Sequence, residues 1–483
     1  MLRARIQFSF YVTGLLLCFL ATVMVLPAMV DLAFHNPDTV VFLESSLATF
    51  AVGALLAVSN RSERPPTGRA FYYLLTVVSW LALGVFASVP LALSSVKLDL
   101  VDIYFEVMSG LTTTGSTVLV GLDGLPPGLL LWRSLLQWFG GIGIIAMAMI
   151  VLPALSVGGM QLFRTESSDI SGKILPRARQ VATVGALVYI GLTVLCAVAL
   201  RLAGMNGFDA INHAMATLAT GGFSTHDASL GHFNSVAIEV VTTAFMAMAA
   251  LPLIYFARFI IEGRRALARD RQVRAFLITL LAAILIVTLW NAAFNHMTLA
   301  VALRHSSFAV TSVLTDTGFV TEDFSAWGSF GTGFMFFLMF VGGCAGSTAG
   351  GIKIFRWQIM LGAVRNQLRV TLSPNLVAPL SYNGKPVDTP MLAAVQTFFF
   401  LYFLSFSVLS LAVMATGLDF LSASSAVAQA MANVGPGLGQ TGGPAGNFAA
   451  VPDSAKLLLV LSMLVGRLEL VTVYVVLMRD FWD

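Results

Sequence analysis

Long apolar segments, each near or above the length that crosses a lipid bilayer as a helix, constrain this sequence more than any other feature. They fall at 6–30, 39–58, 70–94, 129–156, 180–203, 235–261, 274–296, 330–358, 391–416 and 455–478. A helix needs about 20 apolar residues to span the hydrocarbon core. Only 11% of the 483 residues are charged, against roughly 25% in a soluble protein. The sequence therefore predicts an all-α polytopic membrane protein with ten spanning segments and excludes a soluble globular enzyme.

The first apolar segment imitates a signal peptide, because Arg3 and Arg5 precede it. It is too long for the hydrophobic region of a signal peptide and lacks a clear small-x-small cleavage site, so we expect a transmembrane helix. Cys18, Cys196 and Cys344 lie in apolar or Gly-rich stretches without CxxC spacing. They indicate neither a disulfide framework nor a zinc site.

Basic residues predict the orientation of the chain. If the N-terminus is cytoplasmic, most Lys and Arg fall in inside segments. The outside segments then hold only Lys97, Arg133, Arg201, Arg304 and Lys456. Positively charged loops stay on the cytoplasmic side, so we expect a cytoplasmic N-terminus. Acidic residues gather on the opposite side, where they would attract cations.

Four shorter apolar stretches interrupt the series of spanning segments. They lie at 99–112, 208–219, 305–315 and 420–432. At about 12 residues they cannot span a bilayer and suggest re-entrant half-helices. Each runs into a Gly-containing turn, at 111–117 (LTTTGST), 218–225 (LATGGFST), 314–321 (LTDTGFVT) and 431–438 (MANVGPGL).

These turns recur roughly every 100 residues, which is the signature of an internal repeat. The chain divides into two N-terminal helices within 1–60, followed by repeats at 70–160, 175–262, 272–370 and 388–483. A single Gly turn carries little information, because Gly is common in membrane helices. Four equivalent turns, each after a half-helix on the same side, predict helix–P-loop–helix repeats around a central pore.

Non-helical backbone at membrane depth is tolerated where it lines a water-filled path. Four such turns around one axis would point carbonyl groups inward and replace the hydration shell of a cation. The candidate filter residues are Thr113, Thr114, Gly115, Thr220, Gly221, Gly222, Asp316, Thr317, Gly318, Asn433, Val434 and Gly435. Their predicted role is carried mostly by the backbone.

Several motifs together resemble a known family over essentially the whole chain. They are 112–117 (TTTGST), 221–227 (GGFSTHD), 433–439 (NVGPGLG), 137–143 (QWFGGIG), 342–351 (GGCAGSTAGG) and 466–469 (GRLE). The chain resembles the bacterial Trk-type potassium uptake subunit of the Trk/Ktr/HKT superfamily. The two extra N-terminal helices are similar to the Trk branch.

This resemblance implies potassium uptake across the bacterial inner membrane, with the potassium ion as substrate and no organic cofactor on this chain. It implies a homodimer in membrane lipid in which each protomer has its own pore. It also implies a cytoplasmic nucleotide-binding ring, the TrkA-type partner, that regulates flux. The basic cytoplasmic segments are compatible with such a partner, although topology alone explains a charge run. A net charge of +3 does not favour nucleic acid.

Asp316 departs from the resembled family, which usually carries a small or neutral residue at this position, two before Gly318. In members that pass sodium, Ser replaces the first filter glycine. All four aligned positions are Gly here, which favours potassium. A carboxylate at membrane depth is costly and therefore indicates a function. Alternatively, Asp316 accepts hydrogen bonds from loop amides behind the filter.

A Gly-rich stretch interrupts the segment 330–358. Each Gly costs a helix about 1 kcal/mol relative to Ala, so we expect a break. In the resembled family this stretch is an intramembrane gate loop. The candidate gate residues are Gly342, Gly343, Gly346, Ser347, Thr348, Gly350, Gly351 and Arg467. A Gly-rich helix-packing face is the alternative reading.

Arg467 lies in the middle of the last apolar segment, about 20 Å from either end if that segment is one helix. A charge there normally faces a polar cavity or a partner. Glu469 is a poor partner, because residues two apart do not share a helix face. We expect a cation that faces the pore below the filter, and the alternative is a structural ion pair with a carboxylate such as Glu106.

Histidines His213, His226 and His232 lie near the second turn, but their spacing resembles no metal site, and His226 is expected to be a solvated loop residue. The sequence contains no nucleotide-binding or catalytic nucleophile motif, so nucleotide chemistry would reside on a partner. The rival of an ion-conducting protein is a sodium- or proton-coupled transporter with broken helices. Fourfold parallel repetition argues against it, since such transporters usually show inverted repeats. An intramembrane enzyme is disfavoured, because no paired acids or Ser/His pair occurs at helical spacing.

Overall fold

The computed structural model of the chain describes residues 2–61, 70–146, 178–262, 270–376, 379–439 and 441–482. The helices before residue 147 are α1 (Leu2–Ala33), α2 (Thr39–Ser59), α3 (Ala70–Ala87), α4 (Val89–Leu93), α5 (Leu100–Leu111), η1 (Leu122–Gly124) and α6 (Pro127–Ala146). The next are α9 (Ala178–Leu202), α10 (Gly207–Leu218), η4 (Ser229–Phe233), α11 (Val236–Ala249) and α12 (Leu253–Glu262). They are followed by α14 (Arg271–Phe294), α15 (Leu299–Leu314), η5 (Phe324–Ala326), α16 (Gly328–Leu338) and α17 (Ile354–Leu372). The last are α18 (Thr389–Met414), α19 (Phe420–Ala432), α20 (Asp453–Arg467), α21 (Val471–Leu477) and η6 (Arg479–Phe481).

The fold is a polytopic helical membrane protein, as the apolar segments predict. Within the described residues, six helices are long and apolar enough to cross a membrane, and a seventh span is possible if α20 and α21 are counted as one bent segment. The other three expected spans differ from continuous helices. Two are split into shorter pieces, α11 with α12 and α16 with α17, and the third, 129–156, is described only to residue 146.

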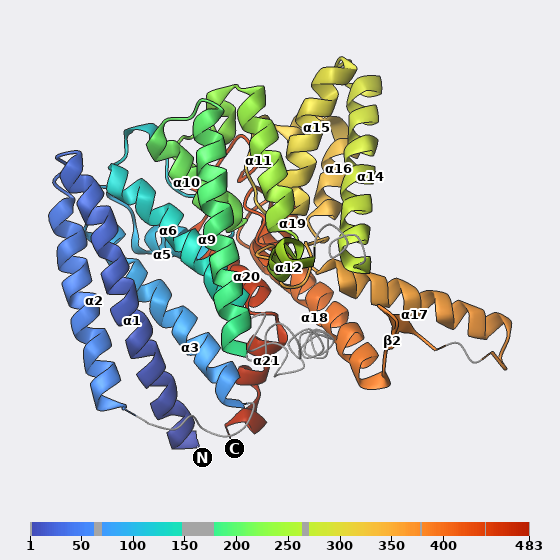
Figure 1. The fold of residues 1–483 in the computed structure, drawn as a ribbon, viewed down its shortest axis with the longest axis horizontal. Coiled ribbons are helices and arrows are strands. Elements are labelled where there is room, and N and C mark those ends of the chain that lie inside the picture. Colours follow the sequence, from blue (N-terminus) through green and yellow to red (C-terminus); the bar gives the residue numbers. More distant parts are fainter. Residues whose placement is uncertain are drawn as a thin grey trace.

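The two N-terminal helices form a hairpin at one side of the molecule (Figure 1). Glycines allow their backbones to approach closely. A Cβ at Gly14 would lie 2.6 Å from the backbone nitrogen of Ala57, and one at Gly53 would lie 2.9 Å from that of Cys18. Small residues at a helix crossing let two helices pack closely in lipid. Both chain termini lie at the same end of the molecule (Figure 1).

All four predicted half-helices are present, as α5, α10, α15 and α19. Polar residues start two of them: the side chain of Asp419 accepts hydrogen bonds from the backbone N–H groups of Leu421 and Ser422, and Asn206 accepts one from Asp209. Such N-caps satisfy amide groups that would otherwise lack partners. Each half-helix is buried over most of its length, as a re-entrant element inside the protein must be.

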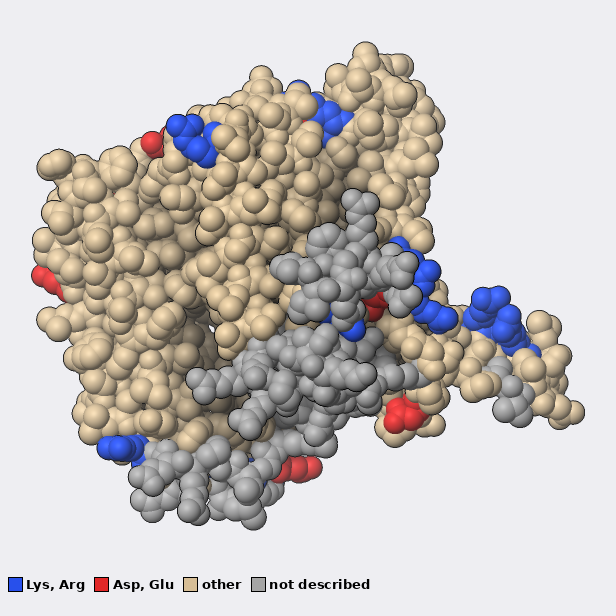
Figure 2. Space-filling model, in the orientation of Figure 1, with Lys and Arg blue, Asp and Glu red and all other residues tan. Residues whose placement is uncertain are grey.

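A short hairpin of β1 (Ser381–Tyr382) and β2 (Lys385–Pro386) is the sheet found in the described part of the chain. The strands are antiparallel, with Tyr382 opposite Lys385. The hairpin follows α17, which projects from the helical body (Figure 1). Figure 2 shows few charged side chains on this face, and basic side chains lie over α17, where Arg365 and Arg369 are exposed.

Candidate functional site

The four half-helices end in the same way. A backbone N–H in each turn donates to the carbonyl five residues earlier: Thr114 to Ser109 (2.8 Å), Gly221 to Ala216 (2.9 Å), Thr317 to Ser312 (2.9 Å) and Val434 to Gln429 (2.9 Å). This bond is part of the Schellman arrangement, in which the preceding residue adopts the left-handed conformation. That residue is Thr113, Thr220, Asp316 or Asn433, with φ of 52°, 50°, 58° and 61°. Gly usually occupies this position and Asn or Asp tolerates it, so the backbone strain falls on the β-branched residues Thr113 and Thr220.

The four glycines that follow close a ring. A Cβ added to Gly115 would overlap the carbonyl oxygen of Gly221, one at Gly222 that of Thr317, and one at Gly318 that of Val434. A Cβ at Gly435 would lie 2.9 Å from the carbonyl oxygen of Thr114, which returns to the first repeat. Each turn therefore contacts the next turn in chain order. The four carbonyl oxygens that precede the glycines lie at these contacts, and no side chain larger than hydrogen fits beside those of Gly221, Thr317 and Val434.

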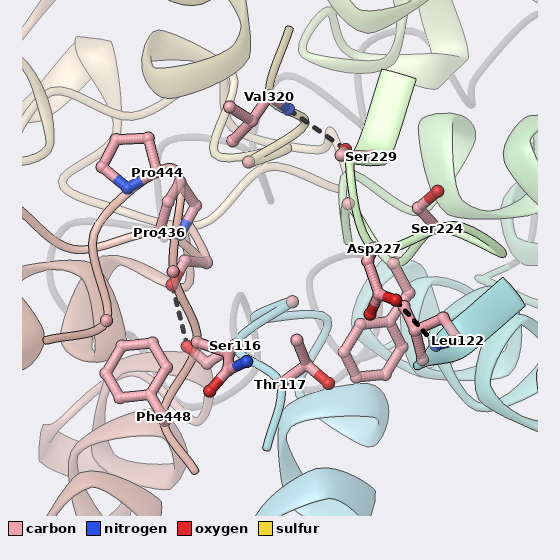
Figure 3. Close-up of a pocket in the computed structure, with 18 of the residues that line it drawn as sticks. Ser116, Thr117, Leu122, Ser224, Asp227, Ser229, Val320, Pro436, Pro444 and Phe448 are labelled. Atoms are coloured by element: carbon pink, nitrogen blue, oxygen red, sulfur yellow. Dashed lines mark hydrogen bonds between the residues drawn. The ribbon is translucent and has the colours of Figure 1, made fainter. Parts of the chain in front are cut away.

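A cavity opens on one side of this ring, and all four repeats line it (Figure 3). We call it the outer cavity. It is held by bonds between repeats. The hydroxyl of Ser116 donates to the carbonyl of Gly435 (2.9 Å), and the N–H of Val320 donates to the hydroxyl of Ser229 (3.2 Å). The four glycines of the ring are among the residues that line it.

Two glutamines support the turns from behind. Gln137 donates to the carbonyl of Gly221 (2.6 Å) and accepts from the N–H of Phe223 (3.1 Å). Gln429 accepts from the hydroxyl of Ser116 (3.0 Å) and from the N–H of Gly435 (3.2 Å). Both side chains are fully buried. Buried amides that satisfy backbone groups fix a loop in one conformation.

A buried ion pair joins the first two turns. The guanidinium Nε of Arg133 donates to Glu106 at 2.8 Å, and its Nη1 donates to the carbonyl of Ser224 at 2.8 Å. Glu106 also accepts from the hydroxyl of Thr117 and the N–H of Val118. Glu106 is thus paired with Arg133. It does not serve as the partner of Arg467 that the ion-pair alternative suggested.

The Gly-rich stretch is unwound and lies directly against the ends of the half-helices. The helix stops at Leu338 and resumes at Ile354, which excludes a continuous helix-packing face. The hydroxyl of Thr348 donates to the carbonyl of Leu218 (2.9 Å), and the N–H of Gly351 donates to that of Ala432 (2.9 Å). Residues 339–353 therefore form a layer on the side of the ring opposite the cavity. We call this segment the inner loop.

Arg467 is the last residue of α20, because the expected helix over 455–478 breaks and bends by 111° between α20 and α21. Its Nη1 donates to the carbonyl of Thr348 at 3.0 Å, and its Nε and Nη2 have no hydrogen-bond partner among the described residues. Glu469 does not bind it and instead pairs with Arg356 at 2.6 Å. Arg467 is therefore a buried cation attached to the inner loop.

Asp316 faces the same layer and does not line the outer cavity. Its side chain is fully buried, and a Cβ at Gly351 would lie 3.3 Å from its Oδ1. Neither of its carboxylate oxygens has a hydrogen-bond partner among the described residues, and Lys353 and Arg467 are the basic groups that act on it electrostatically. The amine of Lys353 also donates to the carbonyl of Ala349. One acidic and two basic side chains thus lie near the inner loop, without a direct ion pair between them among the described residues.

Histidines at the outer end are less solvated than expected. His226 hydrogen-bonds Asp123 through Nδ1 and Asp209 through Nε2 (3.1 Å). Burial lowers the pKa of His226, but its bonds to the two carboxylates outweigh burial and raise the pKa above 6.5. The hydrogen bond between His226 and Asp123 lowers the pKa of Asp123 below 3.8. His213 is buried beneath them and bonds Ser224 (2.9 Å).

The fold and the ring define the class of this chain: a polytopic membrane protein built on four re-entrant half-helices that meet at one point. The family described as TrkH, cation transport protein, matches residues 39–481. The chain belongs to this TrkH family of cation transport proteins, which are not enzymes.

Known relatives cover almost the whole chain. The Trk system potassium uptake protein TrkI of Halomonas elongata is 43% identical over 96% of this chain and 94% of its own length. The Trk system potassium uptake protein TrkH of Escherichia coli K12 is 37% identical over 98% of both. The crystal structure of the potassium transporter TrkH from Vibrio parahaemolyticus has a TM-score of 0.92 and 36% identity, covering 99% of this chain and 100% of that one.

The structure places all twelve candidate filter residues in the four turns and seven of the eight candidate gate residues in the inner loop, with Arg467 bonded to it. Sequence reasoning gave no supporting role to Gln429, Arg133 or Lys353, and it considered Glu106 only as an alternative partner for Arg467. Gln137 lay within a motif of the resemblance but had no assigned role. One signal in the sequence could have indicated the pairing of Arg133 and Glu106: both are charged residues within apolar segments.

Proposed function

We propose that this chain takes up potassium by conducting the ion through the ring of filter turns. The observation that carries the proposal is the closed contact of the four turns, which brings the carbonyl groups of Thr114, Gly221, Thr317 and Val434 to one ring. Rings of carbonyl oxygens replace the hydration shell of a potassium ion in selective channels. Relatives named as potassium uptake proteins are 37–43% identical over the full chain and support this choice of ion.

The half-helices add a favourable field. Each filter turn directly follows the C-terminal end of a half-helix. That end carries a partial negative charge from unpaired carbonyl groups. Four such ends around the ring stabilise a cation there without placing a mobile carboxylate in its path. This conduction needs no organic cofactor.

The inner loop and Arg467 form the proposed gate. The loop packs against the ends of α10 and α19, and Arg467 holds it through the carbonyl of Thr348. A buried cation below the filter raises the energy of a passing potassium ion. Movement of the loop with Arg467 would remove both the steric block and the charge.

The setting of the protein follows from the resemblance and the charge pattern. We propose that the chain lies in the bacterial inner membrane with a cytoplasmic N-terminus, since its bases gather on that side. We also propose that the repeats at 70–160, 175–262, 272–370 and 388–483 each contribute one filter turn. A homodimer and a TrkA-type nucleotide-binding ring on the cytoplasmic face complete the proposal.

Flux into liposomes tests this function. The purified chain is reconstituted alone, and uptake of potassium and sodium is measured under an imposed potassium gradient, with and without a sodium or proton gradient. We expect potassium uptake that exceeds sodium uptake and needs neither coupling gradient. Uptake that occurs only with a sodium or proton gradient would favour the coupled-transporter alternative, and no uptake of either ion would overturn the proposal.

A further inference from the structure

Three potential metal ligands meet at the outer end of the molecule, although they are distant in sequence. Asp123, His226 and His232 each offer a ligand atom, and these atoms all lie within 4.8 Å of one another. Asp123 belongs to η1 in the first repeat. In the second repeat, His226 precedes η4 and His232 lies within it. The spacing of these histidines along the chain resembles no metal site, and the acidic residue that joins them comes from another repeat.

The two loops that carry these ligands are fixed to each other. The carboxylate of Asp227 accepts from the N–H groups of Gly121 (3.0 Å) and Leu122 (3.1 Å), and Figure 3 shows the bond to Leu122. The rings of His226 and His232 are stacked, with centroids 3.6 Å apart and planes 4° apart, so one ring must turn before both can direct a nitrogen lone pair at one ion. The two loops, but not the ligand orientations, are therefore in place before any ion binds.

A carboxylate behind the cluster orients one ligand. Nε2 of His226 lies 3.1 Å from Asp209, whose side chain is buried. Asp209 is itself held by Thr225 (2.6 Å) and Asn206 (2.6 Å). Metal-binding histidines typically donate their second ring N–H to a carboxylate, which fixes the tautomer and leaves the other nitrogen for the metal.

We propose that Asp123, His226 and His232 bind a divalent transition metal ion of the zinc type at the rim of the outer cavity. Two imidazole nitrogens and one carboxylate oxygen are ligands that zinc prefers. The side chains of Asp123 and His232 are 49% and 45% exposed, so an ion can reach them and keep water in a fourth position. In the absence of the ion, the bond between His226 and Asp123 occupies the same place.

The ion would act on transport, a consequence that rests on the proposed function. His226 and the filter glycines both line the outer cavity. A divalent cation bound at its rim opposes the approach of potassium and locks the loops of the first two repeats together. Zinc in the external medium therefore slows potassium uptake.

Zinc binding to the purified full-length chain tests the site directly. Isothermal titration is performed with zinc chloride after chelator treatment, on the wild type, His232→Ala, Asp123→Asn and the control His296→Asn. His296 lies outside the cluster at a left-handed position (φ 54°) that Asn tolerates. We expect one zinc per chain, unchanged in the control and weakened at least tenfold in both ligand variants. No binding by the wild type, or equal affinity in all four proteins, would overturn the site.

A spectroscopic arm and a transport arm complete the experiment. Cobalt chloride added to the chain should give visible d–d absorption that His232→Ala loses. In liposomes, external zinc should slow potassium uptake several-fold in the wild type and the control but less in His232→Ala, each compared with its own rate in chelator. Zinc that binds without slowing uptake would overturn the inhibitory role. Failure of the proposed function is distinct, because uptake would then be absent in chelator while zinc still bound.

Discussion

The ring of turns is nearly symmetric, whereas the layer on its other side, formed by the inner loop and the charged groups near it, is not. The ring is nearly fourfold symmetric, with the same hydrogen bond and the same backbone conformation in every repeat. The layer beneath breaks this symmetry, since its charged groups are Asp316 and Lys353 from the third repeat and Arg467 from the fourth. The ring is formed by backbone carbonyl groups, whereas the layer contributes charged side chains.

This contrast separates the proposed selection step from the proposed gating step within one short path. Backbone carbonyls carry no titratable charge and are fixed by the Schellman turns, so they suit a step that depends on geometry. Buried charges interact strongly at low dielectric, so a small movement of the inner loop changes the energy of a cation considerably. Asp316 belongs to both regions: its backbone completes the ring and its carboxylate faces the layer.

The largest expected effect breaks the ring. A Cβ at Gly318 (φ 80°) would overlap the carbonyl of Val434, so Gly318→Ala must displace a filter group. We expect potassium uptake in liposomes to fall to background. Gly384 has nearly the same φ, 79°, but faces open space. Gly384→Ala therefore carries the same backbone strain without the overlap and should transport normally. Normal uptake by Gly318→Ala would contradict the ring as the conduction path.

The next effect separates the two roles of Asp316. Asn433 holds the equivalent left-handed position in the fourth repeat, so Asp316→Asn keeps the backbone and removes only the charge. Lys353 and Arg467 then lose one nearby opposite charge, but none of the described ion pairs is broken and Glu469 still stabilises the charge of Lys353. We therefore expect a loss of about 1–2 kcal/mol in the free energy of unfolding.

Thermal and denaturant unfolding in detergent measure this loss, and adding Lys353→Met should restore part of it. An unchanged stability with weaker potassium affinity would instead show that the carboxylate acts on the permeating cation, as its position in the sequence alone suggests.

A smaller effect sharpens the gating role. Removing the charge in Arg467→Ala lowers the barrier for potassium by about 1 kcal/mol, or roughly fivefold in uptake by the isolated chain. A deletion within 346–351 should act in the same direction, and both changes should reduce dependence on a cytoplasmic partner. Arg467→Lys keeps the charge and should keep uptake low. Poor expression of Arg467→Ala, rescued by neutralising Asp316, would identify a structural ion pair.

The smallest effect tests the loosest contact of the ring. A Cβ at Gly435 lies 2.9 Å from the carbonyl of Thr114, which leaves more room than the other three contacts. Gly435→Ser should therefore still conduct but discriminate less against sodium, by a few-fold in the flux ratio. Gly417 (φ 103°) faces open space, so Gly417→Ser is the matched control. An unchanged sodium/potassium ratio in Gly435→Ser would argue against Gly435 as a filter residue.

The membrane class, the four half-helices and the four Gly turns that follow them were all predictable from the sequence. These features are local, because the length of an apolar run and the place of a Gly turn are properties of neighbouring residues. The break at the inner loop is local as well, since glycines oppose helix formation wherever they cluster. The sequence did not foretell the break after Arg467, where no Gly or Pro follows and Glu469 instead adopts a left-handed conformation (φ 59°).

The tertiary structure alone decided which side chains meet. Glu106 pairs with Arg133 and not with Arg467, Lys353 of the inner loop acts electrostatically on Asp316, and Asp123 lies beside histidines from another repeat. Such pairs depend on how repeats separated by roughly 100 residues pack against one another, and a charge has no period that reveals its partner. Closure of the ring also depends on tertiary packing, because one turn can take part in a filter only when the other three turns lie beside it.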